Sequence, residues 1–117
     1  MKIRQFFTPL VLGACGVSFA WGQQYTISTI AGNGTAGFSG DGGAPTSAQL
    51  SSPLGLALDS SGNLYIVDSV NERVRKISGG AISTIAGNGT GGFSGDTKAA
   101  TAAEMDGTRN GCVTPKL

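Results

Sequence analysis

The chain has 117 residues, about the size of one ordinary domain, and glycine supplies 20 of them, well above the average usage of about 7%. Its formal net charge of +1 gives no strong attraction to nucleic acid or to an anionic membrane. The absence of histidine excludes Ser-His-Asp and Cys-His catalysis, and two cysteines are too few for a four-thiolate zinc site. We therefore expect no cofactor and no metal, and the composition favours a turn-rich β protein.

Residues 1–22 have the order of a secretory signal peptide. Lys2 and Arg4 precede an apolar stretch from Phe6 to Ala20, which is shorter than the about 20 apolar residues of a membrane span. Small residues follow, and signal peptidase cleavage is expected after Ala20 or Gly22. The protein is therefore predicted to be secreted or periplasmic. The alternative is a first strand or helix that stays buried in the fold.

The segment Leu12-Gly13-Ala14-Cys15 resembles the bacterial lipoprotein box, in which the cysteine is lipidated. Apolar residues continue past Cys15 as far as Ala20, which favours the ordinary signal peptide, with lipid anchoring at Cys15 as the alternative. Removal of the leader would leave Cys112 alone, so no internal disulfide is expected.

An internal repeat determines the predicted architecture. Residues 27–41 (ISTIAGNGTAGFSGD) and residues 82–96 (ISTIAGNGTGGFSGD) agree at 14 of 15 positions, with an offset of 55 residues. The likeness continues weakly to about residue 105 and then stops. We therefore assign residues 23–105 to the repeat region and residues 106–117 to a divergent tail.

Strand and turn signals alternate between the two copies of the repeat. The strands are expected at residues 54–58, 64–67, 73–77 and 82–85, and the turns at residues 60–63, 68–71 and 78–80. Four strands joined by tight turns predict an antiparallel meander. The long loop from Ala31 to Pro53 is expected to hold one short helical turn within residues 44–50.

A repeated four-stranded meander indicates a blade of a β-propeller, because one small sheet buries its faces only by stacking on a neighbour. The segment Pro53–Ile77 (PLGLALDSSGNLYIVDSVNERVRKI) resembles the NHL repeat through its P-x-G, G-N-L-Y and N-x-R-x-R-K positions. The flanking STIAGNGTAGFSGDGG is similar to the inter-blade segment of bacterial secreted NHL proteins. The resemblance implies a β-propeller, usually of about six blades, and implies no single activity.

The predicted fold is all-β, with four-stranded antiparallel blades of an NHL-type β-propeller in an incomplete ring. A closed ring needs about four blades or more, whereas residues 23–105 offer about one full blade plus flanking strands. The chain is therefore expected to be a truncated or fragmentary member. Exposed blade edges favour self-association.

The glycine-rich loops match phosphate-binding patterns only in part. Residues 32–37 satisfy G-x-G-x-x-G after a predicted strand, but a poor helix follows, and Phe38 stands where a P-loop needs its lysine. The favoured interpretation is a loop turned by Asn-Gly, with an aromatic ring packed onto the sheet. The residues concerned are Asn33, Gly34 and Phe38 in the first copy, and Asn88, Gly89 and Phe93 in the second.

Asp41 and Asp96 occupy equivalent positions in the two loops and are candidate ligands for a calcium ion. Calcium takes six to eight oxygen ligands as a rule, and one aspartate in each loop supplies too little negative charge. Capping of loop N–H groups is the expected role of both aspartates.

The remaining candidates are family positions of the NHL resemblance, for which structural roles are expected: Asp59, Gly62, Asn63 and Tyr65, then Asp68, Asn71, Arg73 and Arg75. Asp68 and Asn71 are expected to order a turn, and an arginine to pair with a carboxylate. The alternative is one blade's share of a metal site in a propeller channel. The basic run 73–76 is expected on the solvated face of a strand toward the edge of the sheet.

The predicted function is that of an exported propeller segment with a binding or structural role. Its loops would contact a protein or a small ligand, without nucleic acid and without a membrane span. No catalytic constellation is visible, so no enzyme activity is expected. The alternatives are a fragment of a metal-dependent hydrolase or lyase on a propeller scaffold, and a non-functional truncated product.

Overall fold

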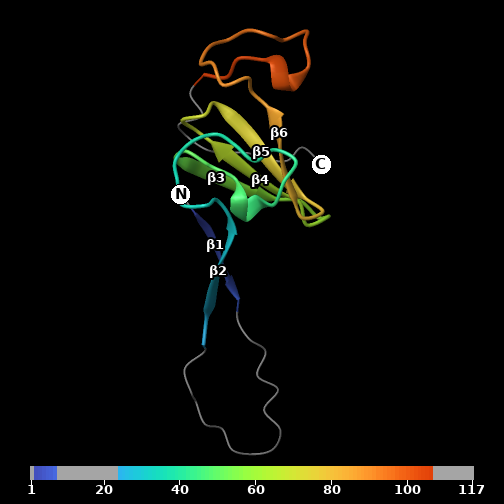
Figure 1. Cartoon of the computed structure of the whole chain (residues 1–117). Helices are drawn as coiled ribbons and strands as arrows, with labels where there is room; N and C mark the ends of the chain where they lie inside the picture. The colour runs from blue at the N-terminus through green and yellow to red at the C-terminus, as the bar shows by residue number, and fades with distance from the viewer. Residues whose placement is uncertain (1, 8–23, 107–117) are drawn as a thin grey trace, which may run out of the picture.

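The structure is a computed structural model that describes residues 2–7 and 24–106. Two antiparallel sheets follow one another along the chain (Figure 1). A two-stranded sheet consists of β1 (Ile3–Phe7) and β2 (Thr26–Ala31). A four-stranded sheet has the order β3 (Pro53–Leu58), β4 (Leu64–Asp68), β5 (Arg73–Ser78), β6 (Ala81–Ala86). The predicted all-β fold and its up-and-down, four-stranded blade are confirmed.

The strands of the blade begin and end within a residue or so of the predicted bounds, because tight turns separate them. Gly79 and Gly80, with φ of 57° and 78°, connect β5 to β6 in the left-handed conformation that glycine adopts without strain. Short 3-10 turns occur in both inter-blade loops, η1 (Pro45–Ser47) and η2 (Ala100–Ala102). The first of them is the helical turn expected within residues 44–50.

The hydrophobic core lies between one face of the blade and the repeat unit that precedes it. The blade contributes Leu64, Ile66 and Ile82, whose cross-strand register places them on one face. The preceding unit contributes Ile3 and residues of β2 and the following loop, namely Ala31, Ala48 and Leu50. A blade thus buries one of its faces against a neighbouring unit of the same repeat.

The pairing of β1 with β2 repeats the pairing of β5 with β6. Each ladder has a register shift after its first pair. The equivalent pairs are Ile3–Ala31 with Val74–Ala86, and Arg4–Thr29 with Arg75–Thr84. β2 and β6 have nearly the same sequence. β1 therefore pairs with β2 in the same way that β5, the third strand of the blade, pairs with β6.

Several predictions concern residues beyond those that the structure describes. Strand β1 belongs to the predicted leader, but the cleavage region, Cys15 and Cys112 lie outside the described residues. Processing and export therefore stay predictions. Within residues 2–7 and 24–106, the structure has no helix of the length and apolar character needed to cross a membrane.

Candidate functional site

The largest polar cluster is built around Arg75 of β5, whose side chain is fully buried. Its Nη2 donates to Asp41 Oδ1 at 2.8 Å and to the Ser39 carbonyl at 3.0 Å. Its Nη1 donates to Asp68 Oδ2 and to the Gln49 carbonyl, both at 3.2 Å. Because hydrogen bonds to charged groups strengthen when they are removed from water, this cluster fixes its members in one arrangement. We call it the arginine clamp.

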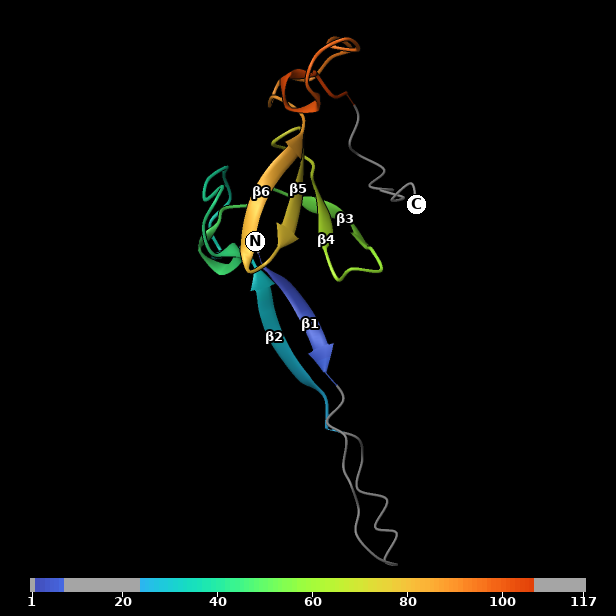
Figure 2. The same cartoon turned by 90° about the vertical axis from the view of Figure 1, so that its right-hand side faces the viewer.

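Three of the four groups that accept from Arg75 belong to the first loop, residues 32–50. The same loop is held at the outer strand of the blade. Thr84 Oγ1 donates to Asp41 Oδ2 at 2.7 Å, and Gly42 N–H donates to the Ile82 carbonyl at 2.7 Å. The clamp therefore joins the blade to the loop of the preceding unit, as the views in Figures 1 and 2 show for the teal loop beside the sheet.

Asp68 and Asn71 connect the β4–β5 turn to this loop. Asp68 is fully buried, and its Oδ1 accepts from the Ser51 N–H at 2.7 Å. Asn71 Nδ2 donates to Asp68 Oδ2 at 2.7 Å and to the Gly37 carbonyl at 2.8 Å. These two residues thus order the turn and also hold the loop against it.

Phe38 lies on the sheet, against the side chains of Arg73 and Arg75 of β5. The Cζ atoms of Arg73 and Arg75 lie 3.8 Å and 4.8 Å from the centroid of its ring, a geometry that favours cation–π attraction. The ring stays 40% exposed. Arg73 also donates to the Asn88 carbonyl at 2.8 Å, so that its guanidinium contacts both glycine-rich loops.

Two sequence-based expectations are wrong in this region. The basic run 73–76 does not lie wholly on a solvated face, because Arg75 of β5 is fully buried. Asp41 does not cap loop N–H groups, since its two carboxylate oxygens accept from Arg75 and Thr84. Asp41 and Arg75 are 34 residues apart, and no local pattern links them.

The β3–β4 turn is built around Asp59. Its Oδ1 accepts from the N–H groups of Ser61 and Asn63, both at 2.9 Å, and its Oδ2 accepts from Asn63 Nδ2 at 2.7 Å and Tyr65 Oη at 3.0 Å. The Asn63 side chain, followed by the backbone N–H, lowers the pKa of Asp59 from 3.8 to about 2. The bond to Asp59 raises the pKa of Tyr65. With Gly62 at a φ of 83°, this is a tight structural turn.

The second loop, residues 87–105, contains the remaining predicted positions. Asn33 and Asn88 play equivalent parts, because the Oδ1 atom of each accepts from the N–H two residues later. Gly34 and Gly89 have φ of 90° and 91°. Phe93 is 88% exposed, so the expected packing of this ring onto a sheet is not found. No hydrogen bond or ion pair to the Asp96 side chain is seen within the described ranges.

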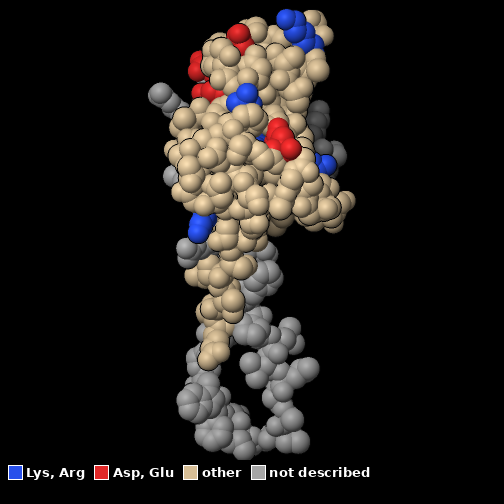
Figure 3. Space-filling view, in the orientation of Figure 1, with Lys and Arg blue, Asp and Glu red and all other residues tan. Residues whose placement is uncertain are grey.

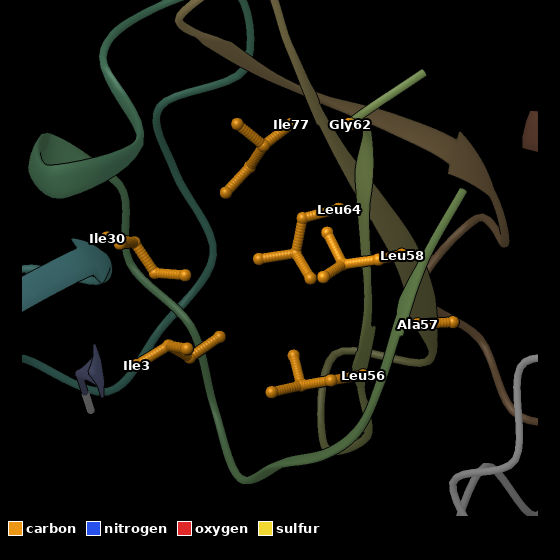
Figure 4. A pocket seen from close by; sticks show the side chains of 8 residues that line it. All are labelled: Ile3, Ile30, Leu56, Ala57, Leu58, Gly62, Leu64 and Ile77. Atoms are coloured by element: carbon orange, nitrogen blue, oxygen red, sulfur yellow. The ribbon is translucent and has the colours of Figure 1, made fainter. Parts of the chain in front are cut away.

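An apolar surface borders the core on β3, an edge strand of the blade. Leu54, Leu56 and Leu58 of β3 are 58%, 54% and 67% exposed. Leu56 and Leu58 line a cavity of about 460 Å³, where they point toward Ile3 and Ile30 across the gap (Figure 4). We call these three residues the leucine face. Sequence alternation identifies these leucines but does not show which of them a neighbouring unit leaves uncovered.

Among the residues that the structure describes, no group of three or more His, Cys, Asp or Glu side chains is placed to hold a metal ion. The carboxylates of Asp41 and Asp68 both face the Arg75 guanidinium, so a positive charge already occupies the position where they converge. What the arrangement does chemically is hold two segments of backbone together.

The comparison with protein families agrees with this architecture. The model of the NHL repeat matches residues 50–77, from the end of the first loop through β4 and most of β5. No curated protein matches the chain.

Proposed function

We propose, because the chain carries an NHL repeat, that it is an exported scaffold segment with a binding or structural role and without catalysis. NHL repeats are typical of propeller-type scaffolds that mediate protein interaction. The polar groups of the clamp support this proposal, because they satisfy one another between loop and blade. A catalytic site instead needs polar groups directed at a substrate.

The leucine face is the observation that carries the proposal. The rest of the same sheet face is buried against a unit of the same repeat, so its natural partner is another apolar sheet surface. Leu56 and Leu58 are more than half exposed and line one cavity, and exposed apolar surface of this kind marks protein–protein contacts. The expected partner is therefore a protein, and self-association is the simplest case.

The test is the oligomeric state of the full chain over a range of concentrations, measured by sedimentation velocity. Leu56→Asp and Leu58→Asp place a charge on the leucine face and should weaken association about tenfold or more. The matched control is Val70→Asp, since Val70 is 65% exposed in the β4–β5 turn. Equal association of the Leu56 and Val70 variants would argue against the leucine face as the contact.

The alternative function, a fragment of a metal-dependent hydrolase or lyase, is tested separately. A calorimetric titration of the full chain with calcium should give no saturable heat, because Arg75 already neutralises the converging aspartates. A saturable heat that Asp41→Asn abolishes would favour the enzyme instead.

A further inference from the structure

The two glycine-rich loops have the same backbone conformation, although only the first is held by the arginine clamp. The N–H groups of Gly32 and Gly87 donate to the equivalent carbonyls of Pro45 and Ala100, both at 3.0 Å. Gly37 and Gly92 share a φ of 155°. The second loop therefore takes up its conformation without the contacts that the arginine clamp gives the first.

The structure shows what the first loop binds. Its Ser39 and Gln49 carbonyls and the Asp41 carboxylate accept from Arg75, and Phe38 lies beneath the guanidinium. The equivalent groups of the second loop are the carbonyls of Ser94 and Glu104, the Asp96 carboxylate and the Phe93 ring. Ser94 and Glu104 are bonded to each other through the Glu104 N–H and the Ser94 carbonyl, at 3.0 Å.

The second loop is open where the first is covered. Phe93 is 88% exposed, against 40% for Phe38. The second loop stands beyond the end of β6, away from the four-stranded sheet (Figures 1 and 2). Within the described residues, nothing takes the place at Asp96 that Arg75 takes at Asp41.

Together with Asp106, the residue that follows it, the second loop is also more acidic than the first loop. Residues 32–51 contain one acid, Asp41, whereas residues 87–106 contain three, Asp96, Glu104 and Asp106, against one base, Lys98. The net charges are therefore −1 and −2. Acidic side chains are visible at the end of the molecule that the second loop forms (Figure 3). This charge is complementary to a strand that carries arginines, as β5 does.

We propose that the second loop is a binding site for an arginine carried on another β-sheet blade. The partner is a four-stranded sheet with an arginine at the position that Arg75 has on β5, and its guanidinium enters between Asp96, the Ser94 carbonyl and Phe93. This inference rests on the proposed scaffold function and specifies the chemistry of one partner. It concerns a surface other than the leucine face.

The blade of this chain serves as the probe, once its own loop is weakened. Asp41→Asn removes the charge that holds Arg75 to the first loop and leaves the second loop intact. The blade of one copy then accepts the second loop of another copy. The full-chain Asp41→Asn variant should self-associate about tenfold more strongly than the wild type in sedimentation velocity.

The equivalent substitution in the second loop is the matched control. The double variant Asp41→Asn, Asp96→Asn should lose the added association. The proposal is overturned if the double variant associates as strongly as Asp41→Asn, or if folded Asp41→Asn associates no more than the wild type. Leu56→Asp leaves this difference unchanged, so a failure of the leucine face is distinguishable.

A measurement on the wild-type chain decides the question if Asp41→Asn does not fold. Arginine amide is titrated against the labelled protein, with lysine amide as control, and backbone amide signals are followed by NMR. Saturable shifts are expected at Gly95 and Asp96 with arginine amide, and much smaller ones at Gly40 and Asp41, where Arg75 already sits. Equal shifts at both loops, or none at either, would overturn the proposal.

Discussion

At the scale of single residues, the fold depends on the buried charge of Arg75. The hydrophobic pattern of the sequence does not predict this burial. Arg75 lies on an inner strand and contacts two carboxylates and two carbonyls. Breaking a buried pair is costly because the remaining charge is left without a partner. Asp68, fully buried beside Arg75, would keep its hydrogen bonds from Ser51 and Asn71 but would lose the opposite charge that Arg75 supplies.

Arg75→Ala is therefore expected to lower the free energy of unfolding by about 3–5 kcal/mol. Arg75→Lys should also destabilise the protein, because an ammonium cannot reach acceptors in two directions as a guanidinium does. Lys76→Ala, next along the same strand, is the control. Urea unfolding measures all three, and a loss below about 1 kcal/mol for Arg75→Ala would mean that the clamp is not needed for stability.

The Asp59 turn predicts a dependence of stability on pH. The pKa of Asp59 is about 2 in the folded protein, below the ordinary 3.8, so the unfolded chain takes up its proton first as the pH falls. The stabilising contribution is fully present above about pH 4 and is lost as the pH falls toward 2. Melting curves of wild type and Asp59→Asn should therefore differ near pH 6 and converge near pH 2. A constant difference across this range would contradict the prediction.

The two clusters differ in how far the sequence predicts them. The Asp59 turn is local, since its donors lie within six residues, and turn chemistry identifies it from the order of residues alone. The clamp joins residues 34 apart through backbone carbonyls as well as side chains. The positions of backbone carbonyls have no sequence signal. The sequence alone therefore predicts that Arg75 is exposed, and its burial follows only from the contact between the first loop and the blade.

At the scale of elements, the loops depend on glycines that leave no room for a side chain. A Cβ on Gly40 would lie 2.7 Å from the Ala48 Cα, whereas one on Gly42 would meet nothing within 4 Å. Both have left-handed backbones, with φ of 89° and 84°. The two positions therefore separate steric clash from backbone strain.

Gly42→Ala should cost about 1–2 kcal/mol, the strain of a left-handed residue with a side chain. Gly40→Ala should cost distinctly more, because the clash with Ala48 also shifts the loop that contacts Arg75. Thermal unfolding of both variants measures the difference. Equal losses would show that the first loop relaxes without disturbing the clamp.

The same scale shows why the sequence predicts the blade but gives a first strand only as the alternative to a leader. Leu54, Leu56 and Leu58 alternate with period two, and glycine turns bound the strands, so that local and long-range signals agree. The residues of β1 instead begin a charged-then-apolar sequence that is typical of a leader. One short apolar segment can serve as an edge strand or as part of a signal peptide, and composition does not distinguish them.

At the scale of the whole molecule, the two equivalent strands of the repeat, β2 and β6, each depend on the strand that pairs with them. β2 and β6 are equivalent strands, and each pairs with a strand of the same register, β1 or β5. The blade face that β1 and β2 help to cover includes the cavity lined by Ile3 and Ile30. Loss of β1 would therefore open a strand edge and part of the core together.

The predicted leader implies that β1 is removed during export, and this prediction can be tested. Cleavage after Ala20 or Gly22, detected by mass spectrometry of protein exported from a bacterial host, would remove β1. The cleaved protein should be less stable than the uncleaved chain by about 1.5–3 kcal/mol, the burial of one aliphatic side chain such as Ile3. It should also associate more strongly with rising concentration, because β2 then presents unpaired backbone groups. An exported chain that retains its first residues would contradict the leader, and equal stability of the two forms would show that β1 contributes little to the fold.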